Sequence, residues 1–167
     1  MESDKDGALI LADTERYEYF MRFAMELAKK AEEIDEVPVG AVAVWEDGEI
    51  IGRGRNRREL SKNALAHAEI EAINNACSYK KGWRLHKCTL YVTLEPCPMC
   101  AGAIINARIK RVVYGASDSK AGAFGSVFNL NEFPLNHKTE VQSGFMECEC
   151  KGELTSFFKE LRERKKL

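Results

Sequence analysis

The sequence predicts an α/β fold in which a mixed β-sheet carries helices on both faces. Segments with apolar residues at helical spacing alternate along the chain with short β-branched runs, which is typical of this class. A hairpin turn signal separates two of the predicted strands. The length of 167 residues fits a single domain. Together these three observations predict one α/β domain.

The first third of the chain is predicted to form one helix and a β-hairpin. Helical spacing of apolar residues predicts a helix over residues 13–34. A nearly continuous β-branched and apolar run predicts a strand over 39–45 that is covered on both faces. Asp47 and Gly48 then form a turn signal that leads into a second strand over 49–54.

The remainder of the chain is predicted to alternate between helices and strands. The predicted helices cover residues 66–77, 98–107 and 147–165, and the predicted strands cover residues 88–93, 111–115 and 139–142. The segment 117–133 shows no periodicity and is predicted to be irregular.

Composition limits the class of protein. Apolar residues make up 45% and charged residues 31% of the chain, a balance that is typical of a globular domain. The longest apolar stretch, Val37–Trp45, is less than half of the roughly 20 residues that a membrane span requires. We expect no membrane association, a cytoplasmic location, a disordered tail over residues 1–12 and one domain over 13–167. The six cysteines are then expected to be thiols or metal ligands rather than disulfides.

The charges are distributed unevenly. The net charge is −1, but residues 1–50 carry a net charge of −9 and residues 51–167 carry +8. Basic side chains cluster over 53–58 and again over 159–166. Such asymmetry allows an electropositive face that could bind nucleic acid, whereas either cluster taken alone is also typical of a solvated surface.

Two short motifs carry the chemistry. His67 and Glu69 lie at the start of one predicted helix, and Cys97 and Cys100 lie at the start of another. One imidazole and two thiolates form a three-ligand zinc set whose fourth position is left for water. Because positions i and i+2 point apart on a helix, Glu69 is expected beside the metal-bound water as a proton shuttle rather than as a ligand. This division of labour is what a hydrolytic deamination requires.

Two structural alternatives remain open for these motifs. The zinc site could be closed by a fourth ligand from His86, His137 or Cys88, which would leave Glu69 without a role. Alternatively, Cys97 and Cys100 could be buried core thiols.

The motif His67-Ala68-Glu69 followed by Pro96-Cys97-Pro98-Met99-Cys100 resembles the signature of the cytidine/deoxycytidylate deaminase superfamily. Over residues 17–166 the chain is most similar to the bacterial tRNA-specific adenosine deaminases. Segments such as Thr89–Cys97 and Val112–Ala116 extend the resemblance beyond the motif.

The resemblance implies a three-layer α/β/α sandwich of the cytidine deaminase type and a homodimer. It also implies the hydrolysis of adenosine to inosine at the wobble position of tRNA, in which zinc-bound hydroxide attacks adenine C6. One Zn²⁺ per subunit would be bound by His67, Cys97 and Cys100, with Glu69 as the catalytic residue. The residues that the resemblance places near the anticodon stem-loop are Asn56, Ala68, Pro96, Val39, Asp118, Lys120, His137, Phe158 and Arg162.

The chain also departs from the family pattern and leaves other functions open. Arg55, Leu65 and Phe124 differ from the usual residues around the nucleotide channel. The same chemistry could instead serve a free guanine, cytosine or cytidine. A non-catalytic RNA-binding module with structural zinc would retain its function without Glu69.

Overall fold

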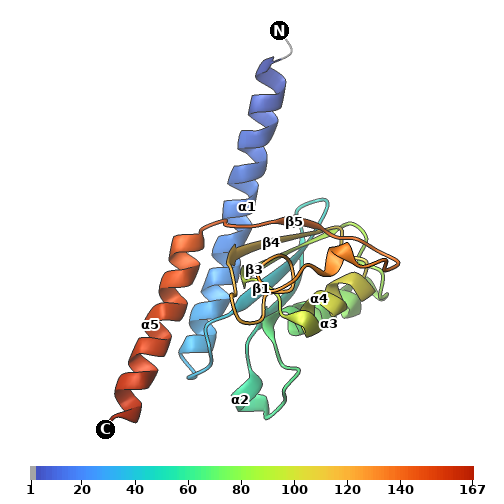
Figure 1. The fold of residues 1–167 in the computed structure, drawn as a ribbon. Coiled ribbons are helices and arrows are strands. Elements are labelled where there is room, and N and C mark those ends of the chain that lie inside the picture. The colour runs from blue at the N-terminus through green and yellow to red at the C-terminus, as the bar shows by residue number, and fades with distance from the viewer. Residues whose placement is uncertain (1–2) are drawn as a thin grey trace.

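The strands form a mixed sheet. A computed structural model describes the backbone of residues 3–167 and the side chains of residues 13–167. The strands in this part of the chain are β1 (Gly40–Trp45), β2 (Ile50–Arg55), β3 (Cys88–Leu94), β4 (Arg111–Ala116) and β5 (Glu140–Gln142). They lie in the order β2-β1-β3-β4-β5 (Figure 1). β1 pairs antiparallel with β2 and β3, and β3, β4 and β5 are parallel.

Helices cover both faces of this sheet. The helices are α1 (Ser3–Glu32), α2 (Arg58–Ser61), α3 (Ala68–Lys80), α4 (Pro98–Asn106) and α5 (Glu147–Lys165), with a 3₁₀ turn η1 (Leu130–Glu132). α1 and α5 pack on one face, and α3 and α4 pack on the other (Figure 1). The predicted three-layer α/β/α architecture is therefore confirmed.

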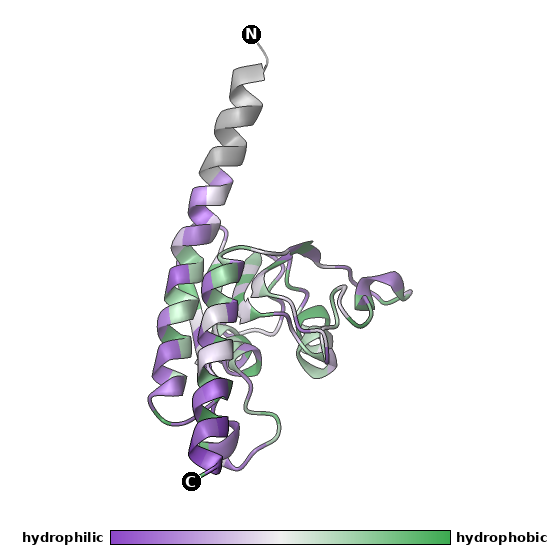
Figure 2. Cartoon of the chain, turned by 60° about the vertical axis from the view of Figure 1, so that its left-hand side comes forward, coloured by the Kyte–Doolittle hydropathy of each residue, from purple (hydrophilic) through white to green (hydrophobic). Residues whose placement is uncertain are grey.

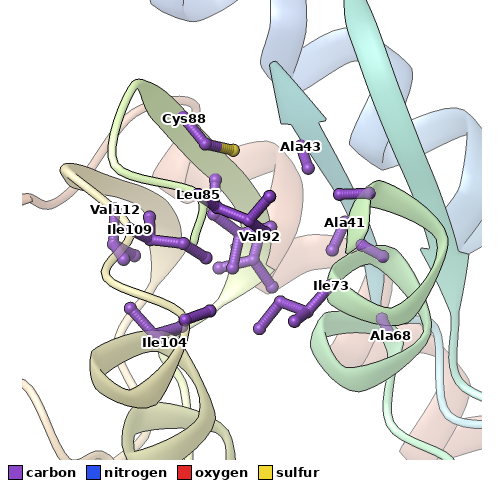
Figure 3. Close-up of a cluster of buried hydrophobic side chains, with 14 of the residues drawn as sticks. Ala41, Ala43, Ala68, Ile73, Leu85, Cys88, Val92, Ile104, Ile109 and Val112 are labelled. Atoms are coloured by element: carbon purple, nitrogen blue, oxygen red, sulfur yellow. The ribbon is translucent and has the colours of Figure 1, made fainter. Parts of the chain in front are cut away.

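The alternation of side chains along the strands divides the core into two layers. Ala41 and Ala43 of β1 face α3 and α4, where they join Ile73 and Ile104 in one buried cluster (Figure 3). The intervening residue Val42 joins the cluster on the side of α1 and α5. Both faces of β1 are thus buried, as its continuous apolar run predicts. Figure 2 shows apolar strands beneath α1 and α5, whose outer faces are largely polar.

Helix α3 lies directly against the backbone of β2. A Cβ atom placed on Gly54 would fall 2.0 Å from the carbonyl oxygen of Ala68, the first residue of α3. Glycine is therefore required at this position for the helix to sit where it does. The contact fixes the start of α3, and with it the segment that carries His67 and Glu69.

The structure corrects one boundary prediction and adds one short element. α1 begins at Ser3 rather than at residue 13. Once a helix has formed, each added residue fixes only its own backbone and gains one hydrogen bond, so extending a helix is easier than starting one. The disordered tail expected for residues 1–12 stays a prediction, although the structure assigns the backbone of 3–12 to α1; residues 1 and 2 lie outside the described residues. The single turn α2 was not predicted, because four residues carry no readable periodicity.

None of the helices within the described residues is long and apolar enough to cross a membrane.

Candidate active site

The ligand group is assembled from the N-terminal ends of two helices. His67 is the N-cap residue of α3, and Cys97 is the N-cap residue of α4. Pro98 occupies the first turn of α4, where a proline's missing N–H costs nothing, and Cys100 follows on the same turn. The His67 Nδ1 atom lies 3.7 Å from Cys97 Sγ and 3.5 Å from Cys100 Sγ.

The three side chains share protons unequally. A hydrogen bond from Cys100, together with those from His67 and the backbone, lowers the pKa of Cys97 to about 4 despite its partial burial. The pKa of Cys100 is correspondingly raised, first by its hydrogen bond to Cys97 and then by burial. The pKa of His67 is raised, mainly by its hydrogen bond to Cys97. The Cys97 thiolate is therefore stabilised by hydrogen bonds from Cys100 and His67. A bound cation would replace the protons of those bonds.

These residues fit a metal ion by geometry and by donor type. Their ligand atoms all lie within 4.8 Å of one another, and no fourth His, Cys, Asp or Glu joins the group among the side chains described. One neutral imidazole and two thiolates suit Zn²⁺, with a coordination position left over for solvent.

The residues proposed to close the site lie elsewhere. Cys88 is buried in the core, where burial raises its pKa to about 12. The His137 ring contacts the carbonyl oxygen of Ile109 at 2.7 Å, and the His86 ring packs near Trp45. The observed arrangement therefore disfavours a closed four-ligand site.

Glu69 is almost completely buried at the start of α3, with 4% of its surface exposed. Burial raises its pKa to about 7, against the opposing effects of a backbone hydrogen bond and of His67. A carboxyl group whose pKa lies near neutrality can both accept and donate a proton at working pH. Its position beside the ligands, but not among them, is the one expected from the sequence.

A cavity of about 240 Å³ adjoins this group. His67, Ala68, Glu69 and Cys97 form its base, and Val37, Val39 and Leu94 give it apolar sides. A larger hollow of about 460 Å³ lies between the C-terminal ends of α1 and α5, but none of the ligand residues line it. We therefore take the smaller cavity as the candidate active site.

Asn56 lines the cavity with its amide already held in place. Its Nδ2 donates to the carbonyl oxygen of Val37 (3.2 Å), and its Oδ1 accepts from the N–H of Arg58 (3.1 Å). A primary amide has two N–H donors and two acceptor lone pairs, so one of each remains for a ligand. Asn56 is thus both a turn residue and a candidate binding group.

Asp118 lines the opposite side of the cavity, and its carboxylate also shapes the local backbone. Its Oδ1 accepts hydrogen bonds from the N–H groups of Lys120 (3.0 Å) and Ala121 (3.1 Å). One oxygen of Asp118 therefore caps a turn of its own backbone. We refer to residues 56–60 as the Arg58 loop and to residues 118–126 as the Asp118 loop.

Five of the expected substrate-binding residues do not line the cavity. Pro96 is buried, and its carbonyl oxygen accepts from the N–H of Ala123 (2.9 Å). Lys120, Phe158 and Arg162 are exposed, and His137 contacts Ile109 as described above. The structure thus gathers Val39, Asn56, Ala68 and Asp118 around the ligand group and leaves these five outside it.

Other cavity residues were not singled out from the sequence. Arg58 belongs to a basic cluster, but the sequence does not show that it faces the site. Its charge lies close enough to His67 to oppose the rise in the pKa of that imidazole. Glu95 directly precedes the Pro-Cys motif, and this adjacency was the one available signal. Phe124, which was expected near the nucleotide channel, is instead buried in the core.

Comparisons with known proteins find related deaminases. The MafB19-like deaminase family model matches residues 15–162. A tRNA-specific adenosine deaminase from Bacillus subtilis is 53% identical over 89% of this chain and 92% of its own length. A protein of the same name from Haemophilus influenzae is 50% identical over 90% of this chain and 87% of its own length.

A solved structure is similar in both sequence and fold. It comes from a study of A-to-I editing by tRNA:A34 deaminases at the wobble position. It is 45% identical, superposes with a TM-score of 0.75, and covers 81% of this chain and 99% of its own. The site geometry, the fold and the extent of these similarities together show that the chain belongs to the tRNA-specific adenosine deaminase family.

Proposed function

We propose that this protein hydrolyses adenosine to inosine at the wobble position of a tRNA anticodon. The observation that carries the proposal is the shared cavity, which His67 and Cys97 of the His/Cys/Cys ligand group line together with the buried Glu69. A cytidine or guanine deaminase could use the same ligand group and the same carboxyl group. The identity of the relatives favours RNA, and so does the basic character of the chain after residue 50.

His67, Cys97 and Cys100 would hold one Zn²⁺, which would supply a water of lowered pKa and hence a nucleophile at neutral pH. Glu69 would take the proton from this water and pass it to the departing amine at C6. A group that transfers a proton twice needs a pKa close to the working pH, and burial provides this for Glu69.

The remaining cavity residues would hold the base. Val37, Val39 and Leu94 offer apolar surface to the ring faces. The free N–H and lone pair of Asn56 would bond to the base edge. Ala68 is the first residue of α3, so its N–H has no partner within the helix and can serve the same edge. An anticodon loop presents its bases unpaired, which lowers the cost of inserting one of them.

Basic residues outside the cavity would bind the phosphates. Figure 1 shows the C-terminal end of α5 and the single turn α2 toward the same end of the molecule. Arg162 and the basic residues around it occupy that end of α5. Both the homodimer and the cytoplasmic location remain expectations that follow from family membership.

The test compares wild-type protein with Glu69→Gln on a synthetic anticodon stem-loop that carries adenosine at the first anticodon position. Free adenosine, cytidine, cytosine and guanine run alongside, and mass spectrometry identifies the products. We expect inosine in the stem-loop alone, and a loss of about a thousandfold or more in kcat for Glu69→Gln. Zinc content and the circular dichroism spectrum should remain unchanged.

Glu71→Gln is a matched control on the same helix. The Glu71 carboxylate faces β2, where its Oε2 accepts from the N–H of Arg55 (3.1 Å), and it does not line the cavity. Deamination of a free base with an inert stem-loop would contradict the RNA substrate. Wild-type turnover by Glu69→Gln would contradict the role of Glu69.

A further inference from the structure

Glu95 is a buried carboxylate with no cationic partner within the described part of the chain. It follows β3 and is only 1% exposed. Burying a carboxylate is costly unless hydrogen bonds replace its lost hydration. None of the ion pairs found among residues 13–167 involves Glu95. Its charge must therefore be stabilised by neutral donors.

The donors all come from the Asp118 loop. Glu95 Oε1 accepts from the N–H of Asp118 (3.2 Å) and from the Ser126 hydroxyl. Glu95 Oε2 accepts from the N–H groups of Phe124 (3.1 Å) and Ser126 (3.2 Å). One side chain thus binds both ends of the loop, which closes around it.

The loop approaches Glu95 so closely that a glycine is needed between the two ends. A Cβ atom on Gly122 would fall 2.3 Å from Glu95 Oε2. The N–H of Gly122 bonds to the carbonyl oxygen of Asp118 (2.9 Å). Together with the two bonds that Asp118 Oδ1 accepts, these contacts fix the Asp118 side chain through the backbone that Glu95 holds.

We propose that Glu95 is a positioning residue that acts through Asp118 to set the side of the cavity facing the sugar of the target nucleotide. This inference rests on the proposed function and adds to it that the Asp118 carboxylate, which lines the cavity, would accept a hydrogen bond from a ribose hydroxyl of the RNA. Glu95 would thereby favour a nucleotide within RNA over a free base. It would take no part in proton transfer.

The test is a double-mutant cycle between Glu95→Gln and Asp118→Ala, measured on the anticodon stem-loop. The amide that replaces the carboxylate in Glu95→Gln would turn an N–H toward backbone N–H groups, so the loop would lose its anchor. We expect KM to rise about tenfold or more in either single variant, since hydrogen bonds to a charged group are worth that much, with a smaller change in kcat. The double variant should resemble Asp118→Ala alone.

Two further variants keep the test decisive. Ser126→Ala removes one hydrogen bond from Glu95, and it should shift KM in the same direction by a smaller factor, again with no added effect on Asp118→Ala. Glu36→Gln is the matched control, because its carboxylate holds the Arg58 loop instead. Its effect should add to that of Asp118→Ala.

Hydrogen exchange separates this inference from the proposed function. In Glu95→Gln, the amides of Asp118, Phe124 and Ser126 should exchange faster without any substrate present. Additive effects in the cycle, unchanged exchange, or loss of zinc together with kcat at constant KM would overturn the role of Glu95. A wild-type protein that makes no inosine while exchange in the variant still increases would overturn the proposed function and confine Glu95 to a structural role.

Discussion

The Arg58 loop and the Asp118 loop flank the same cavity but are held in different ways. Glu36 anchors the Arg58 loop as a cap: its Oε1 accepts from the N–H of Leu60 (2.6 Å), and its Oε2 accepts from that of Glu59 (3.2 Å). Those two N–H groups belong to the first turn of α2, whose donors have no partners within the helix. Glu95 instead gathers an irregular loop that has no helix to support it.

The loops also differ in the charge that they bring to the cavity. The Arg58 loop brings a guanidinium, which suits a phosphate, and the Asp118 loop brings a carboxylate, which suits a hydroxyl. The loops differ in apolar burial as well: Leu60 of the Arg58 loop is 58% exposed, whereas Phe124 of the Asp118 loop is buried in the core. Both loops beside the cavity are thus held by buried carboxylates, whereas the ligand group is held by helix ends packed against the sheet.

The largest effect should come from removing a metal ligand at the bottom of the cavity that both loops flank. Cys97→Ser removes a soft ligand and should lower zinc content and reduce turnover of the stem-loop by more than about a hundredfold. Metal analysis and stem-loop kinetics provide the measurement. Full zinc content together with wild-type turnover in Cys97→Ser would show that Cys97 is not a ligand.

The two anchors should differ in their contribution to stability. Glu95→Ala leaves four donors without an acceptor, and Glu36→Ala leaves two. At about 1 kcal/mol for each hydrogen bond lost, we expect losses of about 4 and about 2 kcal/mol in the free energy of unfolding. Urea denaturation of both variants tests the order, and equal losses would show that the loops are held equally.

Arg58→Ala should raise KM for the stem-loop about tenfold and reduce the salt dependence of binding by about one counterion. Arg57→Ala is the matched control, because the neighbouring guanidinium lies 3.5 Å from Glu71 and lines a different hollow. Titration of the stem-loop at several salt concentrations gives both quantities. Identical behaviour of the two variants would show that Arg58 acts only through general surface charge.

The smallest effect is expected on the outer side of the Asp118 loop. Lys120 is exposed and outside the cavity, so Lys120→Ala should raise KM only about twofold and should lose that effect at high salt. If Lys120→Ala matched Arg58→Ala, the cationic contribution would have to be assigned to both loops rather than to one.

The base of the cavity could be predicted from the sequence because its signals are local. His67, Glu69, Cys97 and Cys100 lie within two short motifs, each at the start of a periodic helix. The strands and major helices were found for the same reason, since periodicity is read within a single window.

The two loops could not be predicted because their supports are distant in sequence. Glu36 reaches residues 23 and 24 positions away, and Glu95 reaches residues 23 to 31 positions away. The single turn α2 exists beside Glu36, and nothing within its four residues predicts it. Phe124 shows the same limit, because burial in the core is decided by neighbours that only the fold brings together.

The close contact between Gly54 and Ala68 has a consequence for changing the substrate range. It couples β2 to α3, so Asn56, just beyond the strand, and Glu69, on the helix, share one rigid frame. A substitution that widens the cavity on that side would displace the Asn56 amide and the Glu69 carboxyl group together. Efforts to admit a larger or differently shaped nucleotide should therefore begin with the Asp118 loop, which can be reshaped without moving that frame.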